Sequence, residues 1–83
     1  MRIYLQLPSI EGKPPKFCHL HLQEDLISGW TLVKEQGSQG LSGKVQKQHF
    51  EHRDQAMDAL MHAKDEAIRK GFKMVFAEGE PRG

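Results

Sequence analysis

The chain has 83 residues, of which 37% are apolar and 28% are charged, and its formal net charge is +1 at pH 7. This length fits one small domain, and the composition excludes both a disordered chain and a membrane protein. The balance of charges also excludes a strongly basic surface on the whole chain, so nucleic-acid binding would require local clustering of lysine and arginine. Cys18 is the single cysteine. It excludes an intramolecular disulfide and favours a cytoplasmic location.

Two segments near the N-terminus, Arg2–Leu7 and Lys16–Gln23, alternate between apolar and more polar residues. In the second segment Cys18 and Leu20 share one face, and His19 lies on the other. A period of two residues is typical of half-buried antiparallel strands. A loop rich in glycine and proline separates the two segments. We therefore predict two strands joined by this loop.

The stretch Gly29–Phe50 is predicted to form a wide hairpin. Residues 30–35 and 44–50 are β-type runs, and glycines recur at positions 37, 40 and 43 between them. Glycine permits positive φ angles and close approach of another backbone, so the turn is a candidate functional feature. Val45 and Phe50 have opposite parity, which predicts a bulge or a crossing of the core edge. Just before the hairpin, Leu26 and Ile27 are expected to pack under the sheet edge.

From Arg53 onward the period becomes helical. Apolar residues follow one stripe, and Gly71 is expected to end the helix. A short apolar segment follows at 72–76, either as an extra strand or packed under the helix, and residues 77–83 are expected to be a frayed tail. The order of elements predicts a single α+β domain: a curved antiparallel sheet of about four strands with one helix packed on one face.

Three segments together resemble one known family. The run GWTLVKEQGSQG, the strand RIYLQL before it and the segment HFEHRDQAMDAL after it are similar to the WGR (Trp-Gly-Arg) domain, and most closely to its short stand-alone bacterial type. The resemblance extends from Met1 to about Phe72. It implies a curved antiparallel sheet with a helix on one face. It also implies nucleic-acid binding, as in poly(ADP-ribose) polymerases, where the tryptophan and arginine of the motif contact DNA at a strand break.

This chain departs from the motif at two of its three letters. Gln36 stands at the tryptophan position and Ser38 at the arginine position, whereas Gly37 is retained. The aromatic ring that would stack on a nucleotide is therefore missing, as is the guanidinium that would bind a phosphate. The remaining polar groups are still able to hydrogen-bond to phosphates or base edges.

The candidate site consists of the motif positions and the lysines around the turn: Lys34, Gln36, Gly37, Ser38, Lys44 and Lys47. The resemblance places a phosphate-contacting lysine at the position of Lys47. The expected partner is DNA or RNA, bound weakly and in a salt-dependent way, or a protein partner in DNA processing. Two alternatives remain open: a degenerate turn with ordinary solvated strand faces, and a protein-interaction module that has lost nucleic-acid binding. We expect no membrane partner, cofactor or small-molecule substrate.

Two other groupings have the residue types of chemical sites. Cys18, His19 and His21, joined by His49 or His52, would offer metal ligands, but Cys18 projects from the opposite face of its strand. On the helix, His62 is four residues from both Asp58 and Glu66, the pattern of a histidine general base. No nucleophile or oxyanion site accompanies it. We therefore predict surface histidines, a solvated helix face and a non-enzymatic protein.

Overall fold

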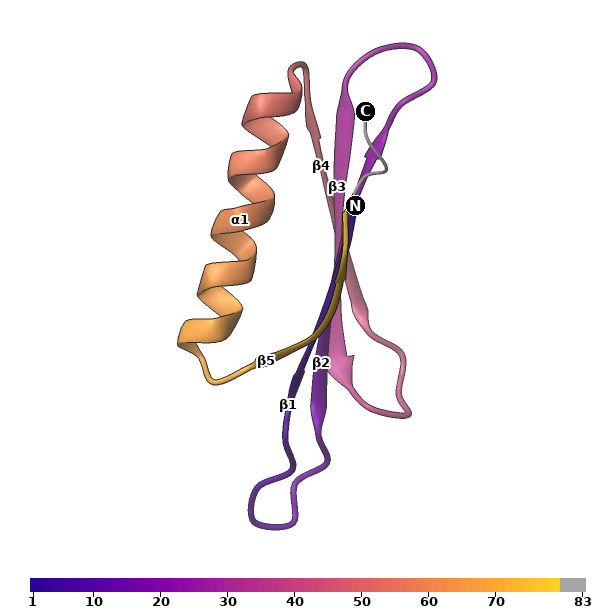
Figure 1. Ribbon diagram of the computed structural model, residues 1–83. Helices are drawn as coiled ribbons and strands as arrows, with labels where there is room; N and C mark the ends of the chain where they lie inside the picture. The colour runs from indigo at the N-terminus through magenta and orange to yellow at the C-terminus, as the bar shows by residue number, and fades with distance from the viewer. Residues whose placement is uncertain (80–83) are drawn as a thin grey trace.

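The computed structural model describes residues 1–79, which form one antiparallel sheet with a helix packed against it (Figure 1). The elements in chain order are β1 (Arg2–Leu7), β2 (Lys16–Glu24), β3 (Trp30–Ser38), β4 (Lys44–Phe50), α1 (Arg53–Arg69) and β5 (Lys73–Glu78). The α+β class predicted from the sequence is confirmed. The predicted count of about four strands is too low, because the segment after the helix adds a fifth.

The strand order in the sheet is β4-β3-β2-β1-β5, and every neighbouring pair is antiparallel. After α1 the chain returns to the sheet beside β1, so the first and last strands of the sequence are neighbours. Their ladder pairs Tyr4 with Phe76 and shifts register between Tyr4 and Leu5. Ala77 and Glu78 belong to this last strand and not to a tail; residues 80–83 lie outside the described residues.

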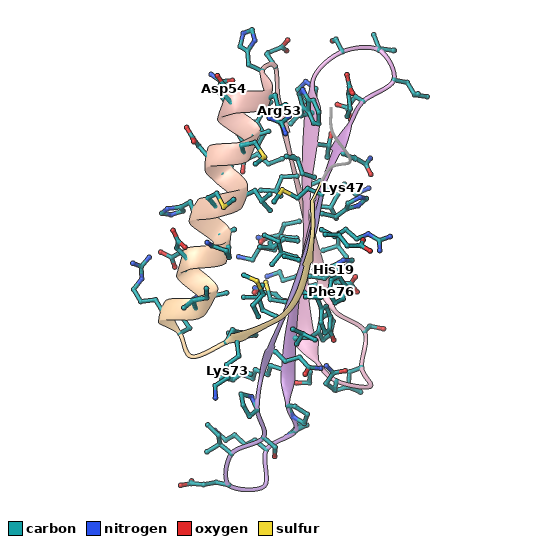
Figure 2. All side chains as sticks on the ribbon, in the orientation of Figure 1. His19, Lys47, Arg53, Asp54, Lys73 and Phe76 are labelled. Atoms are coloured by element: carbon teal, nitrogen blue, oxygen red, sulfur yellow. The ribbon has the colours of Figure 1, made fainter. Side chains whose placement is uncertain are left out.

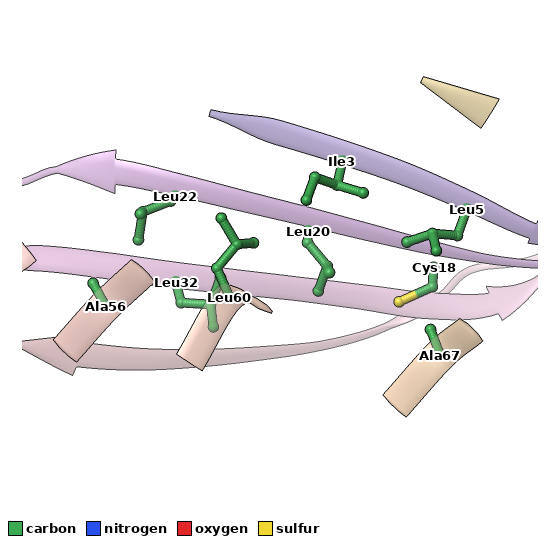
Figure 3. Close-up of a cluster of buried hydrophobic side chains, with 9 residues drawn as sticks. All are labelled: Ile3, Leu5, Cys18, Leu20, Leu22, Leu32, Ala56, Leu60 and Ala67. Atoms are coloured by element: carbon green, nitrogen blue, oxygen red, sulfur yellow. The ribbon is translucent and has the colours of Figure 1, made fainter. Parts of the chain in front are cut away.

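The core lies between α1 and one face of the sheet, as Figure 3 shows. Alternate residues of β1, β2 and β3 point into it, as the two-residue period predicted, and Leu60 meets them from the helix. The fully or nearly fully buried side chains are Ile3, Leu5, Cys18, Leu20, Leu22, Leu32, Ala56, Leu60 and Ala67. Because the helix covers only this face, the opposite face of the sheet is left open within residues 1–79 (Figure 1).

The helix ends where the sequence predicted, at Gly71. This glycine has a φ of 103°, a left-handed conformation that side chains disfavour. Its amide donates to the carbonyl of Ile68 at 3.0 Å, and the amide of Phe72 donates to that of Ala67 at 3.0 Å. This pair of bonds is a Schellman motif, which satisfies the last carbonyls of the helix and turns the chain back toward β5.

Two sequence expectations are wrong: the bulge in β4 and the packing of Leu26 and Ile27 under the sheet edge. The ladder between β3 and β4 runs without a shift from Trp30–Phe50 to Gln36–Lys44, so no bulge explains the parity of Val45 and Phe50. The two residues simply lie on opposite faces, with Phe50 packed against the core and Val45 exposed on the open face.

Leu26 and Ile27 do not pack under the sheet edge. Their exposed fractions are 104% and 97%. The amide of Asp25 donates to the carbonyl of Gly29 at 2.9 Å, which closes a tight loop between β2 and β3. The loop projects beyond the sheet, so its tip has no surface on which to pack (Figure 1).

Candidate nucleic-acid interface

The three motif positions, Gln36, Gly37 and Ser38, are the last residues of β3. Their cross-strand partners on β2 are Cys18, Phe17 and Lys16. The turn that follows is tied to the neighbouring hairpin, because the amide of Gln39 donates to the carbonyl of Pro15 at 2.9 Å and its side-chain amide donates to the hydroxyl of Tyr4 at 2.9 Å. The motif is therefore held on a fixed part of the sheet.

Close packing explains why the glycine of the motif is retained. A Cβ atom on Gly37 would lie 3.0 Å from the Cα of Gly43, across the turn. A Cβ on Gly43 would lie 2.9 Å from the Cγ of Glu35 and 3.0 Å from the Cζ of Phe17. Contacts this short with backbone or ring atoms require the surroundings to move. Gly37 is thus needed for the backbone to close the turn, independently of any ligand.

A cavity of about 530 Å³ opens beside these residues, between the end of the sheet and the C-terminal end of α1. Its polar lining includes three lysines from three different elements: Lys16 at the start of β2, Lys44 at the start of β4 and Lys70 at the end of α1. The other residues that line it are Leu7, Phe17, Gln36, Gly37, Ser38 and Phe72. We refer to this space as the lysine cavity. No carboxylate of the described residues lines it.

A larger hollow, about 850 Å³, lies between α1 and β4, but its lining suits an anion less well. Asp58 and Glu66 line it, together with Lys34, Lys47 and His62. Carboxylates repel a phosphate, whereas three lysines attract one. Of these two spaces, the lysine cavity therefore has the electrostatics of an anion-binding site.

Lys70 lies at the C-terminal end of α1, where the helix dipole is negative. A helix C-terminus carries a partial negative charge, which would disfavour an anion nearby. Lys70 is the C-cap residue, and its positive side chain offsets that charge.

The lysines of this region also affect the buried Cys18. Burial raises the pKa of the Cys18 thiol, and the nearby positive charges of Lys34 and Lys70 act to lower it. The net upward shift keeps Cys18 a neutral, buried thiol.

The predicted site residues do not all come together. Gln36, Gly37, Ser38 and Lys44 line the lysine cavity. Lys34 lies on the same face of β3 as Gln36, and both line a gap of only about 20 Å³ behind the cavity. Lys47 pairs with Val33 on the opposite, open face of the sheet, as Figure 2 shows, and on the edge strand β4 it also borders the larger hollow.

Sequence reasoning missed two of the three cavity lysines. Lys16 reaches the motif only because β2 pairs with β3 so that Lys16 faces Ser38. Lys70 reaches it because the helix packs across the sheet with its C-terminal end at the motif. Neither relation is encoded in spacing along the chain. The only local signal was that each lysine stands at the end of a predicted element.

The histidines do not assemble a metal centre with their neighbours. The rings of His19 and His21 lie 6.4 Å apart and parallel, on the face opposite Cys18. The Nδ1 atom of His49 lies 2.9 Å from a carboxylate oxygen of Asp25. Among residues 1–79, no set of three or more His, Cys, Asp or Glu side chains is placed to hold a metal ion. On the helix, His62 lies 3.9 Å from Glu66 in a solvated position, with 76% of its side chain exposed.

Comparison with known families agrees with this architecture. The family model described as WGR domain matches residues 1–78. The chain belongs to the WGR domain family. WGR domains are in general modules that associate with nucleic acid, so the lysine cavity at the motif lies in a protein of a nucleic-acid-binding type. The searches of curated proteins and of solved structures found no match. Within residues 1–79, no helix has the length and apolar character needed to cross a membrane.

Proposed function

We propose that this WGR domain is a non-enzymatic module that binds DNA or RNA by placing a backbone phosphate in the lysine cavity. The observation that supports this most directly is the convergence of Lys16, Lys44 and Lys70 on one space without a carboxylate in its lining. The hydroxyl of Ser38 and the side-chain amide of Gln36 are hydrogen-bond donors at the same place. Ser38 occupies the arginine position of the family motif and Gln36 the tryptophan position, and each forms a weaker contact with the ligand than the motif residue would.

The number of lysines predicts the strength and the salt dependence of binding. Each neutralised phosphate releases condensed counterions, so three contacts give a slope of log affinity against log salt of about −2 to −3. We therefore expect weak, sequence-independent binding that is measurable at low salt and fades near physiological salt. The net charge of only +1 gives no long-range attraction to compensate.

An amide-resolved NMR titration at low salt tests the proposal. The ligands are a 5′-phosphorylated nicked duplex, an intact duplex and a single-stranded RNA. We expect chemical-shift changes centred on residues 36–44 and on Lys16 and Lys70, which shrink as salt is added. Unchanged spectra with all three ligands would contradict the proposal.

Charge-matched variants make the test specific to the cavity. Lys44→Ala and Lys70→Ala, each made alone, should reduce the salt slope by about one, for the one lost phosphate contact. Lys64→Ala is the control. It also removes a positive charge, but its Nζ lies 3.2 Å from Asp65 and it does not line the cavity. Equal losses from Lys64→Ala and from either cavity variant would mean that only overall charge matters.

A second candidate function is protein interaction, and exposed apolar residues favour it. Leu26 and Ile27 stand at the tip of a closed loop, and Met74 and Val75 are 44% and 52% exposed on the edge strand β5. Such residues cost solubility unless a partner covers them. Substituting Leu26 and Ile27 by serine should leave nucleic-acid binding intact if this tip serves a protein partner.

A further inference from the structure

We infer that the open face of the sheet binds the unpaired bases of a single-stranded nucleic acid, whose backbone enters from the lysine cavity. This inference rests on the proposed function and specifies its ligand. We call the surface the aromatic face; it consists of Tyr4, Phe17, His19, His21 and Phe76.

The rings of the aromatic face form one contiguous group across three strands. The centroid of Tyr4 lies 5.7 Å from that of Phe76 and 6.3 Å from that of Phe17, with interplanar angles of 16° and 17°. His19 meets Tyr4 edge-on at 5.9 Å and stacks on His21 at 6.4 Å. Figure 2 shows His19 and Phe76 on the side of the sheet away from the helix. The group is therefore a continuous surface of π-systems.

Folding alone does not account for rings in this position. Three of the six Phe, Tyr and Trp residues of the chain, Tyr4, Phe17 and Phe76, lie on a face that no other element of residues 1–79 covers. Burial of an aromatic ring stabilises a fold, and the core between helix and sheet is where that gain is available. Half-exposed rings on a sheet surface are instead the arrangement with which RNA-binding sheets stack on bases.

The charge on this face suits a polynucleotide whose bases point inward. One carboxylate stands within these strands: Glu35 of β3 is the cross-strand partner of His19, and Lys47 of β4 supplies a positive charge on the same face. Two of the carboxylates at its margins are paired, Glu78 with Arg2 at 3.9 Å and Asp25 with His49 at 2.9 Å. The carboxylate of Glu35 lies against Gly43, beside the ring of Phe17. Burial lowers the pKa of His21, with further lowering from the N-terminal amine, Arg2 and His19. The His21 ring is thus a neutral stacking surface at neutral pH.

Phe17 connects the aromatic face to the lysine cavity, because it lines the cavity and its ring also packs against Tyr4. A strand with a phosphate among the lysines can therefore continue over Phe17 with its bases on Tyr4 and His19. The bases of a duplex are already stacked on each other and cannot do this. The ligand class that follows is a single-stranded segment, such as an overhang, a flap or an unpaired RNA.

The test compares a 12-nucleotide single strand with a 12-base-pair duplex, both titrated into the full chain at one low salt concentration. His19→Ala should weaken binding of the single strand about fivefold or more, the loss typical of one stacked base, and should leave duplex binding within about twofold. Tyr4→Ala should weaken the single strand as well. Tyr4→Phe keeps the ring but loses the hydroxyl that accepts from Gln39, so it controls for this turn contact, and it should keep the affinity for both ligands. Val45→Ala, an exposed residue of the same face without a ring, is the matched control.

The readouts separate this inference from the proposed function. Lys44→Ala should weaken both ligands, because the phosphate site is common to them. If it does so while His19→Ala and Tyr4→Ala affect neither ligand, the aromatic face is not a binding surface and the lysine cavity stands. If neither ligand binds, the proposed function fails as well. Ring-proton resonances of Tyr4, Phe17 and Phe76 provide a second measurement: they should shift upfield with the single strand and not with the duplex, and unchanged resonances would overturn the inference.

Discussion

The two faces of the sheet are made by alternate residues of the same strands, yet they differ in chemistry. Toward the helix, β1 and β2 present Ile3, Leu5, Leu20 and Leu22, all almost completely buried. Away from it, the same strands present a surface of half-exposed rings around Tyr4. One face therefore contributes most of the free energy of folding through apolar burial, and the other is available for recognition. Substitutions on the two faces should accordingly affect different measurements.

The largest expected effect is on the helix-covered face. Leu20 is fully buried, so Leu20→Ala should cost about 2–5 kcal/mol of the free energy of unfolding, from lost transfer energy and the cavity left behind. A domain of this size with a single cysteine, and so without an internal disulfide, has on the order of 3–5 kcal/mol in total, so this variant should be largely unfolded. The measurement is urea denaturation followed by circular dichroism.

Val33→Ala is the control on the opposite face. Val33 is half-buried between His21 and Lys47 in the adjacent strands. We expect its loss to cost about 1 kcal/mol or less, because little apolar area leaves water there. If the two substitutions cost the same, the open face would be contributing to the core as much as the covered one, which contradicts the comparison.

The next effect concerns two glycines in the loops that join the strands, one between β1 and β2 and one just before β3. Gly12 and Gly29 both have positive φ angles, 79° and 90°, so alanine is strained at either position. A Cβ on Gly12 would meet nothing within 4 Å, whereas a Cβ on Gly29 would lie 2.5 Å from the ring of His49 and 2.6 Å from the carbonyl oxygen of Phe50. Gly12→Ala should cost about 1–2 kcal/mol from backbone strain alone.

Gly29→Ala should cost about 1–3 kcal/mol more, because it adds a steric clash to the same strain. The difference between the two variants isolates the clash, since the backbone term is common to both. Thermal unfolding of both variants is the measurement. Equal destabilisation would show that His49 and the chain around Phe50 shift at no cost, and that the close packing around Gly29 does not contribute to stability.

Local patterns in the sequence predicted much of this fold. The alternation in residues 2–7 and 16–23 identified both strands and their buried faces, and Gly71 marked the end of the helix. The exposed position of Leu26 was not predictable in this way, because it depends on how far a tight loop projects beyond its sheet. The parity of Val45 was likewise resolved only by the register with β3.

The candidate site was predictable only in part, for a related reason. Gln36 and Lys44 are cross-strand partners in one hairpin, so the sequence brings them together through a short connection. Lys16 and Lys70 reach the same cavity through strand pairing and helix packing over long separations in sequence. Lys47 was grouped with the site by spacing, but the two-residue period of β4 places it on the other face.

The smallest expected effect is a pH dependence of stability that originates on the open face. Burial, the N-terminal amine, Arg2 and His19 lower the pKa of His21 below the ordinary value of histidine, about 6.5. Between the pKa of the folded state and that ordinary value, the unfolded chain therefore binds a proton at this residue and the folded chain does not. The free energy of unfolding should rise with pH across this window and become independent of His21 above it.

His21→Gln removes this titration, so its stability relative to the wild type should increase as pH falls from about 7.5 through the histidine range. The measurement is the difference in urea midpoint between the two proteins at several pH values, with agreement in slope expected above pH 7.5. A difference that does not change with pH would show that the surroundings of His21 do not disfavour its charged form. In that case the open face would not hold this ring neutral, and the electrostatic contrast between the two faces would be smaller than the geometry indicates.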